Sequence, residues 1–306
     1  MKKILLSVAT LAAVGAIVAG GTVAFYGDVE TSTGNTFTAG SIELKVDSTS
    51  HYNGMICEGG AGWQPEEGTE QPYYPEQGSP CDGTWSESNL TDGVQKFFNF
   101  SDLKPGDYGE DTISLHVYDN DAWGQFVITP TSDSDNTCTG PEQDAEDANE
   151  TLCGEGEDGE MDENLYFTGW LDQGSTPGFQ CGNPNSTSCN DIYEGDNVYQ
   201  ERYEGTFWDN ETIGDLTHNI GDVLAGAYGR YCADNPSASA DGHNDYGICH
   251  GLAADGRMVG STTYYFGLAW DLPLETGNEV QSDEYIADLT FEVEQHRNNP
   301  NPFGDE

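Results

Sequence analysis

Basic residues are scarce in this chain, which has 9 Lys and Arg against 55 Asp and Glu and a formal net charge of −46. Such a surface repels nucleic acid and anionic lipid, so we expect neither as a partner. The acidity suits a concentrated salt solution, as in a halophile, or a surface that collects divalent cations. An aromatic content of 11% and many β-branched residues argue against general disorder, so we expect the chain to fold.

The motifs of several enzyme classes are also missing. The chain has no His-Glu-x-x-His, the spacing that places two zinc-binding imidazoles on one helix face, and no Gly-x-Ser-x-Gly nucleophile elbow. It has no Cys-x-x-Cys, so a zinc ribbon or a thioredoxin-like site has no support. The best group of metal-ligating residues is His243, Asp245 and His250, whose spacing is not that of a zinc site. We therefore predict no enzyme activity, no catalytic residue and no metal centre.

Long apolar runs are absent after the first segment of the chain. Lys2 and Lys3 precede the apolar run 4–18, and the small residues of 20–24 follow it. This order is typical of a secretion signal, and the run is short for a membrane span. We predict a leader over 1–24, cleaved between Ala24 and Phe25, and an exported chain with no stable membrane span. Without the two lysines, 55 acidic residues face 7 basic residues, a net charge of −48.

Eight cysteines in an exported chain indicate disulfides rather than catalytic thiols. Eight cysteines allow 105 connectivities, and we predict that neighbours in the sequence pair because each such pair brackets a polar, Gly- and Pro-rich segment. The predicted disulfides are Cys57–Cys81, Cys138–Cys153, Cys181–Cys189 and Cys232–Cys249.

Alternation of apolar and polar residues recurs along the chain, as in half-buried antiparallel sheets. It is clear in 42–46, 113–117, 262–272 and 289–293. The segment "AWGQFVIT" follows a "DND" turn, from which we predict a hairpin with the preceding strand. Strands at both ends of the chain favour a single domain. We predict an all-β, jelly-roll-type antiparallel sandwich over 41–306.

One segment and three loops depart from this pattern. In "THNIGDVLAGAYGRYC" the apolar residues follow helical spacing, which predicts one short helix. Long loops are expected over 48–90, 133–163 and 172–200, stapled by the cysteines. Residues 142–163 alone hold 11 carboxylates and no Lys or Arg.

Two acidic segments are candidates for cation binding, and five sequons are candidates for glycosylation. Carboxylates alternate in "EGEDGEMDEN" (155–164) and "ADGHNDYG" (240–247), as in loops that bind hard cations, although neither matches an EF-hand. We predict no bound cofactor. Two alternatives stay open for the acidic segments: they bind Ca²⁺, or they are solvated loops without a ligand. The candidate glycosylation sites are Asn89, Asn99, Asn149, Asn185 and Asn210.

The segment that follows the predicted cleavage site begins with two aromatic residues. At period two, Phe25, Val29 and Phe37 share a face, and the phase changes after Gly40. Two strand-competent segments therefore meet at "AGS". The first is either an ordinary strand of the domain's own sheet or an arm that completes the sheet of a neighbouring molecule.

Four stretches resemble the TasA/camelysin family of exported biofilm fibre proteins, which are matured by a SipW-type signal peptidase. They are "MKKILLSVATLAAVGAIVAGGTVAFYGDVETSTGNTFTAGSIELKV", "SDLKPGDYGEDTISL", "VYDNDAWGQFVIT" and "YYFGLAWDLPLETGNEVQSDEYIADLTFEVEQHRNN". The first, with its "Asn-x-Phe-x-Ala-Gly-x-x-x-Leu" pattern, is the most specific. The long loops have no counterpart in the resemblance.

The resemblance implies a secreted jelly-roll subunit that polymerises head to tail with copies of itself by donor-strand exchange. Its donor arm would be residues 25–40, with Phe25, Val29 and Phe37 as anchors in an apolar groove. Two alternatives remain open. One is a monomeric surface adhesin or binding module, and the other is a cell-surface metalloprotease of the camelysin type.

Overall fold

The computed structural model describes residues 27–31, 35–37, 42–66, 74–145, 158–181, 191–213 and 216–304. The predicted leader, its cleavage site and the anchor Phe25 lie outside the described residues. Within the described helices, none is long and apolar enough to span a membrane.

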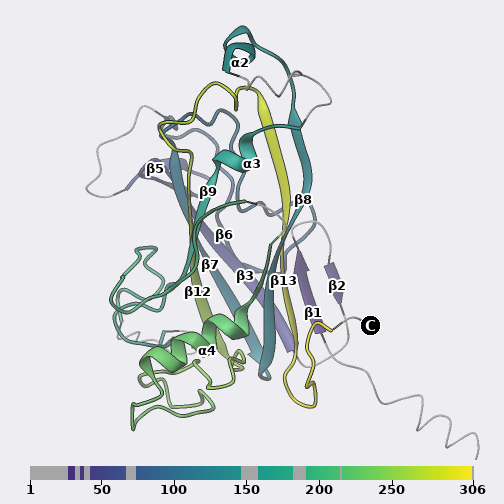
Figure 1. The fold of residues 1–306 in the computed structure, drawn as a ribbon. Helices are drawn as coiled ribbons and strands as arrows, with labels where there is room; N and C mark the ends of the chain where they lie inside the picture. Colours follow the sequence, from purple (N-terminus) through teal and green to yellow (C-terminus); the bar gives the residue numbers. More distant parts are fainter. Residues whose placement is uncertain are drawn as a thin grey trace, which may run out of the picture.

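Two antiparallel sheets pack face to face, so the fold is the predicted all-β sandwich (Figure 1). The smaller sheet has the order β11 (Leu216–Asn219), β8 (Ala122–Asp135), β13 (Asp283–Gln295), β1 (Gly27–Thr31), β2 (Asn35–Phe37). The larger has the order β10 (Thr206–Thr212), β9 (Tyr166–Leu171), β12 (Thr262–Asp271), β7 (Tyr108–Asp119), β3 (Ile42–Tyr52), β4 (Met55–Glu58), β5 (Gly62–Pro65), and β6 (Trp85–Ser88) also pairs with β3.

The alternating strands contribute their apolar faces to one main core between the sheets. In β3, Leu44 and Val46 are fully buried and their neighbours are partly or fully exposed. Phe291 and Val293 of β13 belong to the same core from the opposite sheet. Alternation therefore predicts correctly which residues of these strands point inward.

The predicted hairpin between the strands around the "DND" turn is wrong. β7 lies between β12 and β3, whereas β8 lies between β11 and β13 in the other sheet. The chain changes sheet directly after Asp119, whose backbone is left-handed with φ 66°. Ala122 then forms an isolated bridge with Met258. β12 and β13 are divided between the sheets in the same way, and such crossings produce the jelly-roll type of sandwich.

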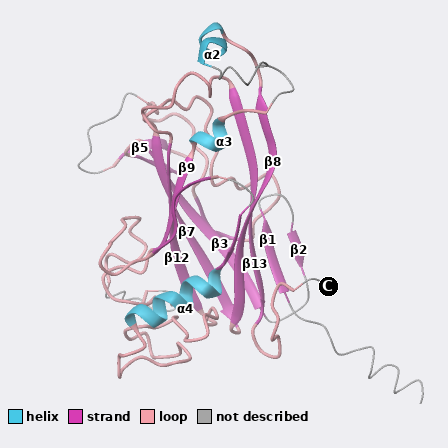
Figure 2. Cartoon of the chain, in the orientation of Figure 1, coloured by secondary structure: helices cyan, strands magenta, loops and turns pink. Residues whose placement is uncertain are grey.

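The expected helix over the segment from Thr217 to Cys232 is α4 (Ile220–Tyr231), which lies at one end of the sandwich (Figures 1 and 2). Its first turn is capped by the Asn219 side chain, which accepts a hydrogen bond from the Gly221 N–H at 2.8 Å. Buried Ile220 and Leu224 fix it to the core.

The prediction of a single helix is wrong, because the described residues also form α2 (Gly140–Ala145) and α3 (Met161–Asn164). Thr139 and Glu142 form a reciprocal pair at the start of α2. The Thr139 N–H donates to Glu142 Oε2 at 2.7 Å, and the Glu142 N–H donates to Thr139 Oγ1 at 3.3 Å. This is a capping box, so the sequence signature Thr-x-x-Glu marks the start of α2 within the acidic segment.

Two of the predicted disulfides lie among the described residues and are formed: Cys57–Cys81 and Cys232–Cys249. Cys138 and Cys181 are also disulfide-bonded. Cys153 and Cys189, their predicted partners, lie outside the described residues, so those two pairings stay predictions. The bridges tie loops to the sandwich, which limits the unfolded chain and stabilises the fold.

Candidate functional site

The predicted arm lies at the edge of the smaller sheet. β1 pairs antiparallel with β13 from Gly27 opposite Glu294 to Thr31 opposite Thr290, and β2 pairs with the outer side of β1. Figure 1 shows both strands beside the C-terminal half of β13. The N-terminal segment therefore forms two strands at the edge of its own sheet, with β2 outermost.

β13 is longer than the strand that covers it. It pairs with β8 over its whole length, from Asp283 to Gln295, but with β1 only over residues 290–294. Among the described strands, none pairs with the β1 side of residues 283–289. An edge with unpaired backbone groups is a template for another strand.

The register of β1 sets its residues opposite particular residues of β13. Val29 is opposite Glu292, whereas Asp28 is opposite Val293 and Glu30 is opposite Phe291. The apolar position Val29 is thus in register with a carboxylate, and acidic positions are in register with core residues of β13.

The gap between the two sheets beside α4 is nearly filled. An apolar cavity of about 20 Å³ lies there, and its lining includes Phe126, Phe207, His218 and Ile220. This space holds about one water molecule. It is too small for an aromatic side chain.

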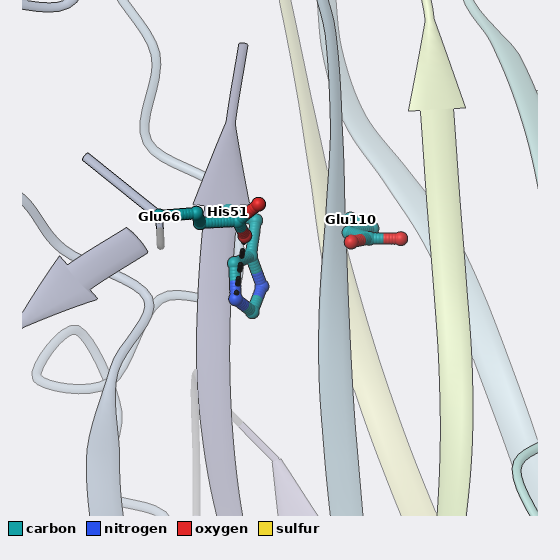
Figure 3. A group of neighbouring side chains, drawn as sticks. All are labelled: His51, Glu66 and Glu110. Carbon is teal, nitrogen blue, oxygen red and sulfur yellow. Dashed lines mark ion pairs between the residues drawn. The ribbon is translucent and has the colours of Figure 1, made fainter. Parts of the chain in front are cut away.

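A second candidate site is formed by His51, Glu66 and Glu110 (Figure 3). His51 lies on β3 and is paired in register with Glu110 on β7, and Glu66 follows β5. One ligand atom from each of the three lies within 4.8 Å of the others. His51 Nε2 donates to Glu66 at 3.2 Å, and its Nδ1 accepts from the Asn197 side-chain amide at 2.8 Å.

Burial dominates the electrostatics of this His51 cluster. It raises the pKa of Glu110 to about 8, and the charges of Glu66, Asp172 and Asp196 add to the rise. Burial lowers the pKa of His51, although Glu66 opposes the effect. A neutral imidazole beside a carboxyl that holds its proton near pH 7 is therefore the favoured state.

The His51 cluster does not fit a catalytic zinc ion. Both ring nitrogens of His51 are occupied by Glu66 and Asn197, so no lone pair of the ring is directed at a shared ligand position. Catalytic zinc sites also use more nitrogen or sulfur donors than one imidazole. The arrangement instead fixes the residue after β5 against the outer face of the larger sheet.

The residues of the best sequence-based metal group do not place their ligand atoms within 4.8 Å of one another. His243 Nε2 pairs with Asp121 at 3.1 Å, and Asp121 also accepts from Arg257 at 2.7 Å. His250 is buried and its Nδ1 donates to the Asn244 carbonyl at 2.9 Å. Both histidines therefore have local structural partners, and Asp245 is exposed.

Buried carboxylates organise the loop between β9 and β10. Asp172 accepts from the backbone N–H groups of Gly195 and Asn197, and Glu204 accepts from those of Gly174 and Gln200. Burial raises the pKa of Asp172 to about 7 and that of Glu204 to about 8. These side chains act as internal caps for loop backbone, a role that composition alone had not indicated.

A further group, Asp135, Glu142 and Asp283, also brings three ligand atoms within 4.8 Å. It lies where β8 ends and β13 begins, away from the β1 end of the strand. Of the candidate glycosylation sites, Asn99 and Asn210 are exposed and Asn89 is half-buried, while Asn149 and Asn185 lie outside the described residues.

These features define an antiparallel β-sandwich whose N-terminal segment forms two strands at one edge of the smaller sheet. A sequence model of the family described as "Camelysin metallo-endopeptidase" matches residues 1–53, which contain that segment and reach the end of β3. The resemblance to the TasA/camelysin family is thus confirmed over this N-terminal stretch. No curated protein and no solved structure matches the chain.

Proposed function

We propose that the mature chain is an extracellular structural subunit that polymerises by donor-strand exchange into pilus-like or biofilm-matrix fibres. The observation that supports the proposal is the incompletely covered side of β13: β1 pairs only with residues 290–294, and among the described strands none pairs with that side of residues 283–289. A SipW-type signal peptidase would release the arm, and the released arm of one subunit would take the place of β1 on the next.

Exchange of β1 between subunits replaces one backbone ladder on β13 by another, because the neighbour's arm pairs with β13 as an extended strand. Three apolar anchors contribute about 5–9 kcal/mol when fully buried, and association costs roughly 4–15 kcal/mol. The anchors Phe25, Val29 and Phe37 therefore need the ladder hydrogen bonds and further contacts to hold a fibre together.

In a fibre, the arm of a neighbour can pair with β13 in a register that differs from the register of β1. A slip of one residue moves every side chain of a strand to the other face of its sheet. Such a slip would pair Val29 with Phe291 or Val293 in place of Glu292. We propose that the arm of a neighbour binds β13 in this shifted register.

The cis pairing of β1 with β13 favours the alternative of a monomeric surface adhesin. In that case the arm is an intrinsic strand and the long loops form the binding surface. A peptidase activity, named in the description of the matching family, is the third alternative. It would be supported by proteolysis that is lost with chelator and in His243→Ala.

Electron microscopy of the purified mature protein tests the proposal. We expect filaments from the full mature chain and a folded, filament-free monomer after deletion of residues 25–36. Terminal sequencing should place Phe25 first. Two results together would contradict the proposal: full-length protein that stays monomeric in high salt, and a deletion variant that fails to fold. They would show that the segment is a strand of its own domain, as in a monomeric adhesin.

A further inference from the structure

Asp135, Glu142 and Asp283 come from three separate elements and converge at one end of the sandwich. Asp135 ends β8, Glu142 lies in α2, and Asp283 begins β13. Figure 1 shows α2 at the end opposite α4. One carboxyl oxygen from each residue lies within 4.8 Å of the other two.

The three carboxyl groups meet in a largely buried position, where charged carboxylates without a counter-charge destabilise the fold. Asp135 is 2% exposed and Glu142 is 0% exposed. Among the described residues, neither Glu142 nor Asp283 forms an ion pair with a basic side chain. Buried charges normally have a partner of opposite sign or a metal ion.

Each of Glu142 and Asp283 has one oxygen committed to the protein and one that is not. Glu142 Oε2 accepts from the Thr139 N–H at 2.7 Å, and Asp283 Oδ2 accepts from the Glu160 N–H at 2.8 Å. The other oxygens, Glu142 Oε1 and Asp283 Oδ1, are buried and have no hydrogen-bond partner. A buried acceptor left without a partner costs about 1–3 kcal/mol.

We propose that Asp135, Glu142 and Asp283 bind a Ca²⁺ ion. Ca²⁺ lies about 2.3–2.6 Å from its oxygen ligands, so two ligands on opposite sides of the ion are about 5 Å apart. The spread of the three ligand atoms fits within that span. The ion would neutralise the cluster and give the uncommitted oxygens their missing partner.

The donor set favours Ca²⁺ over other metals. Only carboxylate oxygens are present, which suits hard cations rather than zinc or copper. Mg²⁺ needs near-ideal octahedral geometry with ligands at about 2.0–2.1 Å and keeps much of its water, whereas Ca²⁺ accepts irregular carboxylate sites. Asp133, two residues before Asp135 on β8, also has a buried oxygen without a partner and adds negative charge.

Acidic side chains surround Asp283 on several sides. Burial raises the pKa of Asp283 to about 7, and Asp135, Glu142 and Asp133 add to the rise. Around Asp133, Asp162 and Asp158 are the further acidic neighbours. A cation at this position would neutralise this concentration of negative charge.

The ion would connect the long acidic loop to the sheet. α2 holds Glu142 through the capping box with Thr139, and the segment before α3 touches the same site through the Glu160 N–H. Binding at this point would order residues 139–145 and 158–164 against the junction of β8 and β13. The inference is independent of whether β1 exchanges between subunits.

Calorimetric titration of the EDTA-stripped mature protein with CaCl₂ in 0.5 M NaCl tests the site. We expect one saturable site per chain and a higher melting temperature with Ca²⁺. Asp283→Asn and Glu142→Gln should weaken binding by roughly 10- to 100-fold or more, since loss of even an outer-shell partner has effects of that size. Glu284→Gln, at the next and exposed position of β13, is the matched control and should bind like the unaltered protein.

Three results would overturn the assignment: no saturable Ca²⁺ binding, unchanged affinity in Asp283→Asn, or displacement of Ca²⁺ by an equal concentration of Mg²⁺. Glu142→Gln removes part of the capping box and can unfold α2. Asp283→Asn keeps that box intact, so it decides the question if the Glu142 variant does not fold, with circular dichroism as the check on its structure.

Discussion

Val29 of β1 lies directly opposite Glu292 of β13. Opposed residues of an antiparallel pair have Cα atoms about 4.5–5.5 Å apart, within the range that a disulfide spans. Two cysteines at these positions therefore report which chain supplies the strand that covers β13.

We predict that a mixture of Val29→Cys chains and Glu292→Cys chains forms cross-linked dimers during assembly, visible on a non-reducing gel. If the neighbour's arm binds one residue out of register, the yield should rise when Phe291→Cys or Val293→Cys replaces Glu292→Cys. Glu284→Cys, at the other end of β13, is the control and should not cross-link. Filaments without any link at residues 291–293 would show that the arm binds elsewhere.

A second prediction concerns removal of the disulfide Cys232–Cys249. This bridge joins cysteines that are 17 residues apart in the sequence and ties the C-terminal end of α4 to the loop before β12. A bridge that closes a loop of this length limits the unfolded chain and raises the free energy of unfolding by about 3 kcal/mol. We expect Cys232→Ala with Cys249→Ala to lower the free energy of unfolding by about that amount in urea titrations. The matched variant without Cys57 and Cys81 should lose a similar amount, whereas an unchanged midpoint would show that neither bridge limits the unfolded state.

Sequence alternation was sufficient to predict the inward face of the long strands and the position of α4. Leu44, Phe291 and Leu268 are buried where period two places them. Alternation could not tell whether consecutive strands pair, because a strand alternates in the same way beside any neighbour. The backbone of Asp119 and the bridge of Ala122 to Met258 decide that β7 and β8 belong to different sheets.

The candidate sites were less predictable than the fold. Glu142 carried a local signal, the capping box with Thr139, but nothing in the sequence links it to Asp283, which follows more than a hundred residues later. His51 and Glu110 meet only through the register of β3 and β7. Sites assembled by long-range pairing depend on topology, and topology was the part of the prediction that failed at the "DND" turn.

A third prediction concerns the salt dependence of assembly. Mature subunits near −48 bring like charges together at each addition. The screening length is about 30 Å at 0.01 M salt and about 3 Å at 1 M, so repulsion should be strong in dilute buffer. We expect polymer yield by light scattering to require molar salt or millimolar Ca²⁺, and neutral substitutions within 142–163 to lower that requirement if the segment lies near a contact. Equal yields at low salt with chelator and at high salt would show that the acidic surface faces solvent in the fibre.

The last prediction concerns pH, because several buried carboxyl groups have a raised pKa. Burial places the pKa of Glu110, Glu194 and Glu204 at about 8 and that of Asp172 and Asp283 at about 7. In the unfolded chain these groups titrate near pH 4. Between about pH 4 and pH 8 the folded state therefore binds more protons than the unfolded state, and its stability falls as the pH rises.

Buried histidines have the opposite effect on the pH dependence of stability, and they act at lower pH. Burial lowers the pKa of His51, His218 and His250, so their destabilising effect begins as the pH falls below about 6.5. Of these two sets of groups, the carboxyl groups dominate from about pH 6.5 to 8.5, and each that loses its proton contributes up to about 1.4 kcal/mol per pH unit. We expect the melting temperature in chelator to decrease over this range. Glu110→Gln should make the decrease shallower, whereas the exposed Glu43→Gln should not, and a melting temperature that rises from pH 6.5 to 8.5 would show that these groups are ionised in the folded protein at neutral pH.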